Sequence, residues 1–113
     1  MARMPFGPGL VIRRQLLCPV CGTLLADAAY RRLPPNLTLR AADGTIMQPT
    51  SAAVLLAQLQ PGARSEDPRA RYVEQNLGEL VYELRCVAGH QVLRTMPEIV
   101  RRIRTARGHG TTV

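Results

Sequence analysis

The three cysteines of the chain and one of its two histidines fall into two short clusters that lie far apart in the sequence. The first cluster is Cys-Pro-Val-Cys-Gly at residues 18–22, and the second is Cys-Val-Ala-Gly-His at residues 86–90. Thiolates and imidazoles are the ligands that a tetrahedral zinc ion prefers, and structural zinc sites use four of them. The sequence therefore predicts one structural Zn²⁺. Its predicted ligands are Cys18, Cys21, Cys86 and His90.

Other interpretations of these residues remain open at this point. Three cysteines in a hydrophobic core and a histidine on the surface would need no metal, because free cysteine is often buried as a small apolar residue. A lone Cys-x-x-Cys can also be a redox pair, although no βαβ pattern surrounds residues 18–21 as in thioredoxin-like proteins. A rubredoxin-like iron site would need a fourth thiolate, which the sequence lacks.

The two clusters resemble the knuckles of the zinc ribbon superfamily, in which two strand–turn–strand units hold one ion. Residues 82–91 (Tyr-Glu-Leu-Arg-Cys-Val-Ala-Gly-His-Gln) are similar to ribbon knuckles in which histidine replaces the fourth cysteine. The resemblance covers only about residues 11–26 and 80–96. It implies a small antiparallel β core with an inserted segment, because 64 residues separate Cys21 from Cys86.

The local patterns predict an α+β fold in a single zinc-ribbon-like domain over residues 10–108, preceded by a flexible arm at 1–9 and followed by a tail at 109–113. Short strands are expected before and after each knuckle. The insert, residues 27–78, is expected to hold a hairpin over 36–48 around an Asp-Gly turn and a helix over 51–60 capped by Thr50. Asp67 and Pro68 are typical of the start of a second helix, which would run to about Gln75.

The last predicted element is an amphipathic, basic helix over residues 96–107. Thr95 and Glu98 have the spacing of a capping box, and apolar residues follow at helical intervals until Gly108. Arginines occupy the other side of this helix. They form a broad cationic surface that is either a solvated face or a phosphate-binding one.

The chain has 113 residues and a formal charge of +7, and all of its basic side chains are arginines. Such a balance favours a partner with phosphate groups, although a GC-rich genome would produce the same arginine content. Pairs of arginines also lie on either side of the first knuckle. The candidate nucleic-acid-binding residues are Arg13, Arg14, Arg31, Arg32, Arg101, Arg102, Arg104 and Arg107.

The composition argues against an enzyme. Ser51 and Ser65 are the only serines, the one histidine outside the two clusters is His109 in the Gly-rich tail, and no glycine-rich phosphate loop is present. A small-molecule substrate is therefore not expected. No apolar run approaches the roughly 20 residues that a membrane span needs, and the first residues do not resemble a signal peptide. We expect a cytoplasmic protein without a membrane partner.

Two functions fit these observations. The first is a zinc-binding protein that contacts DNA, RNA or a nucleic-acid machine such as a polymerase or the ribosome, which is the company in which zinc ribbons are often found. The second is a zinc-stabilised adaptor or accessory subunit of a protein complex, for which the leucine-rich residues 54–59 would be a docking surface.

Overall fold

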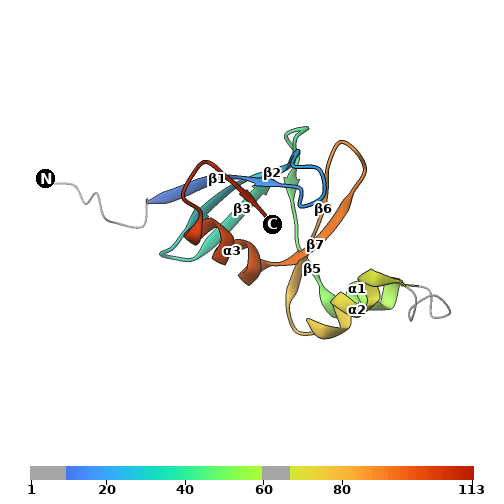
Figure 1. Ribbon diagram of the computed structural model, residues 1–113. Coiled ribbons are helices and arrows are strands. Elements are labelled where there is room, and N and C mark those ends of the chain that lie inside the picture. Colours follow the sequence, from blue (N-terminus) through green and yellow to red (C-terminus); the bar gives the residue numbers. More distant parts are fainter. Residues whose placement is uncertain (1–9, 60–66) are drawn as a thin grey trace, which may run out of the picture.

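The structure is a computed structural model that describes residues 10–59 and 67–113, so the predicted arm at residues 1–9 lies outside the described part. Within that part the fold is α+β, with two sheets and three helices (Figure 1). The strands are β1 (Val11–Leu17), β2 (Leu24–Arg31), β3 (Asn36–Arg40), β4 (Ile46–Met47), β5 (Thr50–Ser51), β6 (Leu80–Arg85), β7 (Gln91–Thr95) and β8 (Gly110–Thr112). The helices are α1 (Ala52–Gln58), α2 (Pro68–Gln75) and α3 (Met96–Thr105).

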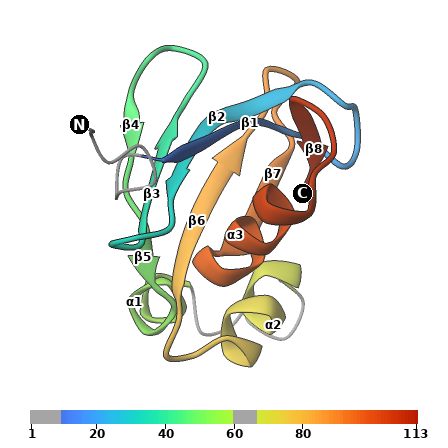
Figure 2. The same ribbon diagram turned by 90° about the vertical axis from the view of Figure 1, so that its left-hand side faces the viewer.

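The larger sheet has five strands in the order β4-β3-β2-β1-β8 (Figure 2). Its pairs are antiparallel except for the β1–β8 pair, which is parallel. Successive residues of a strand point to opposite faces of a sheet. Leu16, Ala28 and Leu39 are buried on the inner face, whereas Arg13 and Asp27 lie on the outer face and are exposed.

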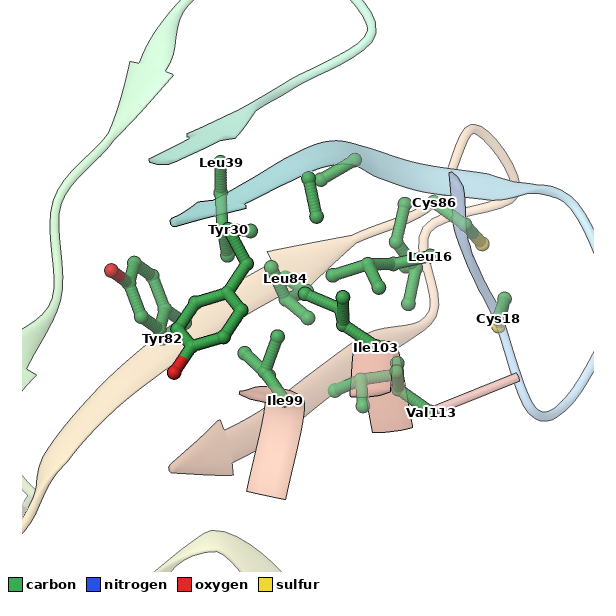
Figure 3. Packing of buried hydrophobic residues seen from close by; sticks show 14 residues of the cluster. Leu16, Cys18, Tyr30, Leu39, Tyr82, Leu84, Cys86, Ile99, Ile103 and Val113 are labelled. Carbon is green, nitrogen blue, oxygen red and sulfur yellow. The ribbon is translucent and has the colours of Figure 1, made fainter. Parts of the chain in front are cut away.

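The smaller sheet, β5-β6-β7, separates two clusters of buried side chains. Tyr82 and Leu84 of β6 pack against the inner face of the larger sheet and against α3, in the main core (Figure 3). Val81 of β6 and Leu93 of β7 point the other way and pack against α1 and α2, in the second core. The main core comprises Leu16, Cys18, Leu25, Ala26, Ala28, Tyr30, Leu39, Tyr82, Leu84, Cys86, Val92, Ile99, Ile103 and Val113.

Helix α3 begins as the sequence predicts. The Thr95 hydroxyl accepts the backbone N–H of Glu98, and the Glu98 carboxylate accepts the backbone N–H of Thr95, which completes the capping box. Ile99 and Ile103 are fully buried in the main core, so the predicted apolar stripe holds the helix against the sheets. The helix ends at Thr105, two residues before the predicted end.

The predicted hairpin over residues 36–48 is present as β3 and β4, and α2 begins at Pro68 with Asp67 as its cap, as predicted. The predicted cap of the preceding helix is wrong by one residue. Ser51 accepts the N–H of Val54, whereas Thr50 pairs with Val81 as part of β5. Both residues belong to β5 and the helix begins only at Ala52, so Ser51, the residue directly before it, takes the capping role.

Two segments are more ordered than the sequence predicts. Strand β2 continues to Arg31, so the predicted start of the insert at residue 27 falls inside a strand of the main sheet. The predicted tail at residues 109–113 is instead strand β8, which pairs with β1, and Val113 is buried in the main core (Figure 3). None of the helices in the described residues has the length and hydropathy of a membrane span.

Candidate metal centre

The four predicted ligands converge at one end of the molecule. The sulfur atoms of Cys18, Cys21 and Cys86 and a ring nitrogen of His90 all lie within 4.8 Å of one another. We call these four residues the metal cluster. They come from two hairpins that are far apart in the sequence, β1–β2 and β6–β7. The prediction that the two clusters of the sequence meet in the fold is confirmed.

The first knuckle is a tight turn between β1 and β2. Its backbone is closed by two hydrogen bonds, from Cys18 N–H to the Thr23 carbonyl (2.8 Å) and from Gly22 N–H to the Cys18 carbonyl (2.9 Å). Gly22 has a φ of 76°, which favours glycine over any residue with a side chain. The turn also brings the backbone N–H of Val20 to 3.4 Å from the Cys18 sulfur. The same backbone that directs the thiol toward the centre therefore supplies it with a donor.

The second knuckle repeats this arrangement between β6 and β7. Cys86 N–H donates to the His90 carbonyl (3.1 Å), and Gly89 N–H donates to the Cys86 carbonyl (2.9 Å). Gly89 has a φ of 92°. The strand pairing of Arg85 with Gln91 fixes the two ends of the turn. Each knuckle thus holds its two ligands on a short turn that its flanking strands position.

The spacing of the ligand atoms fits a tetrahedral metal ion. Zinc bond lengths of about 2.3 Å to sulfur and about 2.0 Å to nitrogen give tetrahedral edges of roughly 3.5–3.8 Å. The Cys21 and Cys86 sulfurs are 3.6 Å apart, and Nδ1 of His90 lies 3.3 Å from the Cys86 sulfur and 3.9 Å from the Cys18 sulfur. Three thiols and one imidazole at these distances are a chemically suitable donor set for such an ion.

The pKa values of Cys21 and Cys86 favour the thiolate form that binds metal. Hydrogen bonds from the hydroxyl and the backbone of Thr23 hold the pKa of Cys21 below its ordinary value. Burial raises the pKa of Cys86, but hydrogen bonds from the His90 backbone and from Cys21 outweigh it and bring the pKa to about 6. Hydrogen bonds with the Cys21 and Cys86 thiols raise the pKa of His90.

Burial differs among the four ligands. Cys18 and Cys86 are buried at the end of the main core away from Tyr30 and Tyr82 (Figure 3), whereas Cys21 is exposed. All three thiols are free, without a disulfide. A set of core cysteines chosen only for packing would not place an exposed thiol against a buried one. Four protein ligands would also complete the shell of a tetrahedral ion, which fits a structural site.

One residue of the centre was missed by sequence reasoning. The Thr23 hydroxyl lies 3.0 Å from the Cys21 sulfur, and the Thr23 carbonyl closes the first turn. Its position directly after Gly22 is a usable signal, since a hydroxyl there can reach back to the preceding thiolate. His109, the other histidine, is exposed directly before β8 and is not part of the metal cluster.

The candidate nucleic-acid-binding arginines do not form one surface. Arg13 lies on the outer face of the larger sheet, beside Ala29 of β2. Helix α3 packs against the inner face, so its exposed Arg101, Arg102 and Arg104 lie on the other side of the sheet (Figure 1). The remaining members, Arg14, Arg31, Arg32 and Arg107, are half-buried or exposed.

Comparisons with protein-family models, with curated proteins and with solved structures found no match for this chain.

Proposed function

We propose that this protein is a non-enzymatic zinc-binding protein, in which Cys18, Cys21, Cys86 and His90 hold one structural Zn²⁺ in a zinc-ribbon-like pair of knuckles. The observation that carries the proposal is the convergence of three thiols and an imidazole from two separate hairpins. Zinc fits better than a harder cation, because thiolate and imidazole ligands select against Mg²⁺ and Ca²⁺. A bound ion would fasten the β1–β2 hairpin to the β6–β7 hairpin at the end of the main core.

We further propose that the protein binds nucleic acid, or a nucleic-acid machine such as a polymerase or the ribosome, through its arginine side chains. The support is electrostatic. Within residues 10–59 and 67–113, the one ion pair closer than 4.0 Å joins Arg69 and Asp67, so no candidate arginine is neutralised by a carboxylate at that distance. Unpaired guanidinium groups are well suited to phosphate oxygens.

Two measurements test this function. Metal analysis of the purified protein should find one zinc per chain, and cobalt substitution should give the sulfur-to-metal charge-transfer band of thiolate ligation. Binding of mixed-sequence DNA and RNA should weaken with salt, with a log–log slope of about −0.9 per phosphate contacted on duplex DNA and about −0.7 on single strands. A metal-free protein that is fully folded, or the absence of any nucleic-acid binding at low salt, would contradict the respective half of the proposal.

A second candidate is an adaptor in a protein complex, and one observation favours it. Val20 and Val87, at the tips of the two knuckles, are 68% and 82% exposed. Next to the first tip lies an apolar hollow of about 240 Å³, whose lining includes Pro19, Tyr72 and Val92. A protein partner held by such apolar surface would bind with little dependence on salt, in contrast to nucleic acid. A V20S/V87S variant should lose such a partner and should keep its metal.

A further inference from the structure

A hollow of about 430 Å³ lies on the outer face of the larger sheet. Its floor is formed by Ala29 of β2 and Thr38 of β3, which are neighbours in the strand register. We call it the outer-face hollow. It faces away from α3, because that helix packs on the inner face of the same strands. Its volume is within the range of about 300–1,000 Å³ that is typical of small-ligand sites.

The outer-face hollow is cationic. Two guanidinium groups of the outer face line it, from Arg13 and Arg40, against the carboxylate of Asp27, whereas the Arg14 side chain points to the inner face with Leu16 and Ala28. Within the described residues no carboxylate comes within 4.0 Å of these arginines. Guanidinium groups bind phosphate through parallel hydrogen bonds, which gives them geometry as well as charge for this task. A rigid sheet also holds the stems of these arginines at fixed separations.

We infer that the outer-face hollow binds a phosphate group, and that it is the place where the nucleic-acid backbone is held. The second part deepens the proposed function and rests on it. Arg13 and Arg40 would contact the phosphate from the two sides of the floor, and Thr38 would donate its hydroxyl. Asp27 weakens the attraction for the anion and is in reach of sugar hydroxyls. Arg40 and Thr38 are therefore additional candidate phosphate-binding residues.

The exposed arginines of α3 are less suited to holding a phosphate group. The arginines there stand on a convex helix surface, and the hollow beside Arg101 and Arg102 measures only about 30 Å³. That volume is less than a tenth of the outer-face hollow's. Helix α3 can attract a polyanion by charge, but the hollow beside Arg101 and Arg102 offers far less room than the outer-face hollow.

The test uses the metal-loaded full chain and two probes, a single-stranded ten-nucleotide RNA and inorganic pyrophosphate. Five single variants and one double variant on α3, R101Q/R104Q, are compared with the unmodified protein. R13Q and R40Q each remove one charge from the hollow, and A29L fills its floor without changing the charge. R71Q removes a charge from an exposed position on α2 and is the matched control. Circular dichroism and metal content establish that each variant folds.

We expect R13Q and R40Q each to weaken binding of the RNA about tenfold at low salt, the loss typical of one charge-assisted hydrogen bond. Each should also make the salt slope shallower by about 0.7. A29L should weaken binding of the RNA by a similar factor, because the longer side chain fills the hollow. The salt slope should be unchanged, because no charge is removed. D27N, which removes the one acidic group, should strengthen binding, and R71Q should change it less than twofold.

The outcomes separate this inference from the proposed function. If RNA binds and only an R101Q/R104Q variant weakens it, the hollow is not the phosphate site, although the proposed function stands. If RNA does not bind but pyrophosphate does, and R13Q, R40Q and A29L each weaken it, the hollow is a phosphate site and the nucleic-acid proposal is wrong. If neither probe binds, both are wrong.

Discussion

Tyr72 of α2 donates its hydroxyl hydrogen to Oε1 of Glu98, in the first turn of α3. The Tyr72 oxygen in turn accepts the backbone N–H of Thr95 at 2.8 Å, so the side chain takes part in the cap of α3. Helix α2 belongs to the second core through Val73, and α3 belongs to the main core through Ile99. This contact is therefore a polar link between the two cores, made by a carboxylate that also caps a helix.

The hydroxyl of Tyr72 is expected to contribute measurably to stability. Replacing it in Y72F leaves Glu98 without one of its donors at a partly buried position, which should lower the free energy of unfolding by about 1–2 kcal/mol. Urea unfolding of the metal-loaded protein measures this difference. The matched control is Y82F, because the Tyr82 hydroxyl makes no hydrogen bond within the described residues. Equal losses in the two variants would show that the link carries no specific stabilisation.

The same link predicts how stability varies with pH. Burial raises the pKa of Glu98, but hydrogen bonds from Tyr72 and Thr95 outweigh it and hold the pKa below its ordinary value. The Glu98 carboxyl therefore binds its proton more tightly in the unfolded chain than in the folded one. The stabilisation that the ionised carboxylate provides is present at neutral pH and is lost as the pH falls through the folded-state pKa. Burial and the hydrogen bond to Glu98 raise the pKa of Tyr72 to about 12. Its contribution is present below the ordinary value of 10 and is lost as the pH rises toward about 12.

Urea midpoints of the unmodified protein and of Y72F, measured from acid to alkaline pH, test these signs. The difference between the two proteins should be largest near neutral pH and should shrink at both ends of the range. Taking the difference removes the effect of the metal ligands, which also titrate in acid but are common to both proteins. A difference that is constant with pH would mean that Tyr72 and Glu98 do not share a proton-dependent contact.

Metal removal is expected to unfold the protein. Structural zinc contributes about 10–16 kcal/mol in zinc-finger peptides at neutral pH, which is comparable to or larger than the whole stability of a small domain. Chelation should therefore abolish the cooperative melt seen by circular dichroism, and H90A should do the same without a chelator. H109A is the matched control, since His109 is exposed and outside the metal cluster. An unchanged melt after metal removal, with the loss of metal verified, would exclude a structural role.

Two parts of the molecule could be predicted from local sequence. The ligand set was predictable because cysteine and histidine are rare in this chain and occur at knuckle spacing. Helix α3 was predictable because Thr95 and Glu98 define its first turn and the apolar residues follow its period. In both cases the determining residues lie within a few positions of one another, so no knowledge of the tertiary fold was needed.

The features that were missed depend on partners far away in the chain. Strand β8 has only three residues and is fixed by parallel pairing with β1, from Gln15↔Gly110 onward, which no local pattern of Gly-Thr-Thr indicates. The outer-face hollow likewise depends on strand register, because pairing of Asp27 with Gln15 and with Arg40 places all three on one face. Which side chains share a face of the sheet can be worked out only when the order and register of the strands are known.

Val113 should be a stabilising core residue. Its side chain is 5% exposed and packs in the main core, and its carbonyl oxygen accepts a hydrogen bond from Arg94 at 2.6 Å. V113A removes two buried methyl groups and should lower the free energy of unfolding by about 2 kcal/mol. T112A is the control, since Thr112 is an exposed neighbour on β8. Urea unfolding that does not distinguish the two variants would show that this strand contributes nothing to the core.

Gly89, in the turn of the second knuckle, has a left-handed backbone conformation. Gly89 and Gly44 have the same φ of 92°, and a Cβ atom added at either position would meet no other atom within 4 Å. G89A and G44A should therefore each cost about 1–2 kcal/mol through left-handed backbone strain alone. Only Gly89 closes a metal-binding turn, by donating its N–H to the Cys86 carbonyl.

G89A is therefore expected to weaken metal binding about tenfold, because the strain is relieved by distorting the turn that holds Cys86 and His90. G44A should leave the metal affinity unchanged while it lowers stability by a similar amount. Competition with a chromophoric chelator measures the first quantity and urea unfolding the second. Equal metal affinities in the two variants would show that the second knuckle does not depend on its glycine to present its ligands.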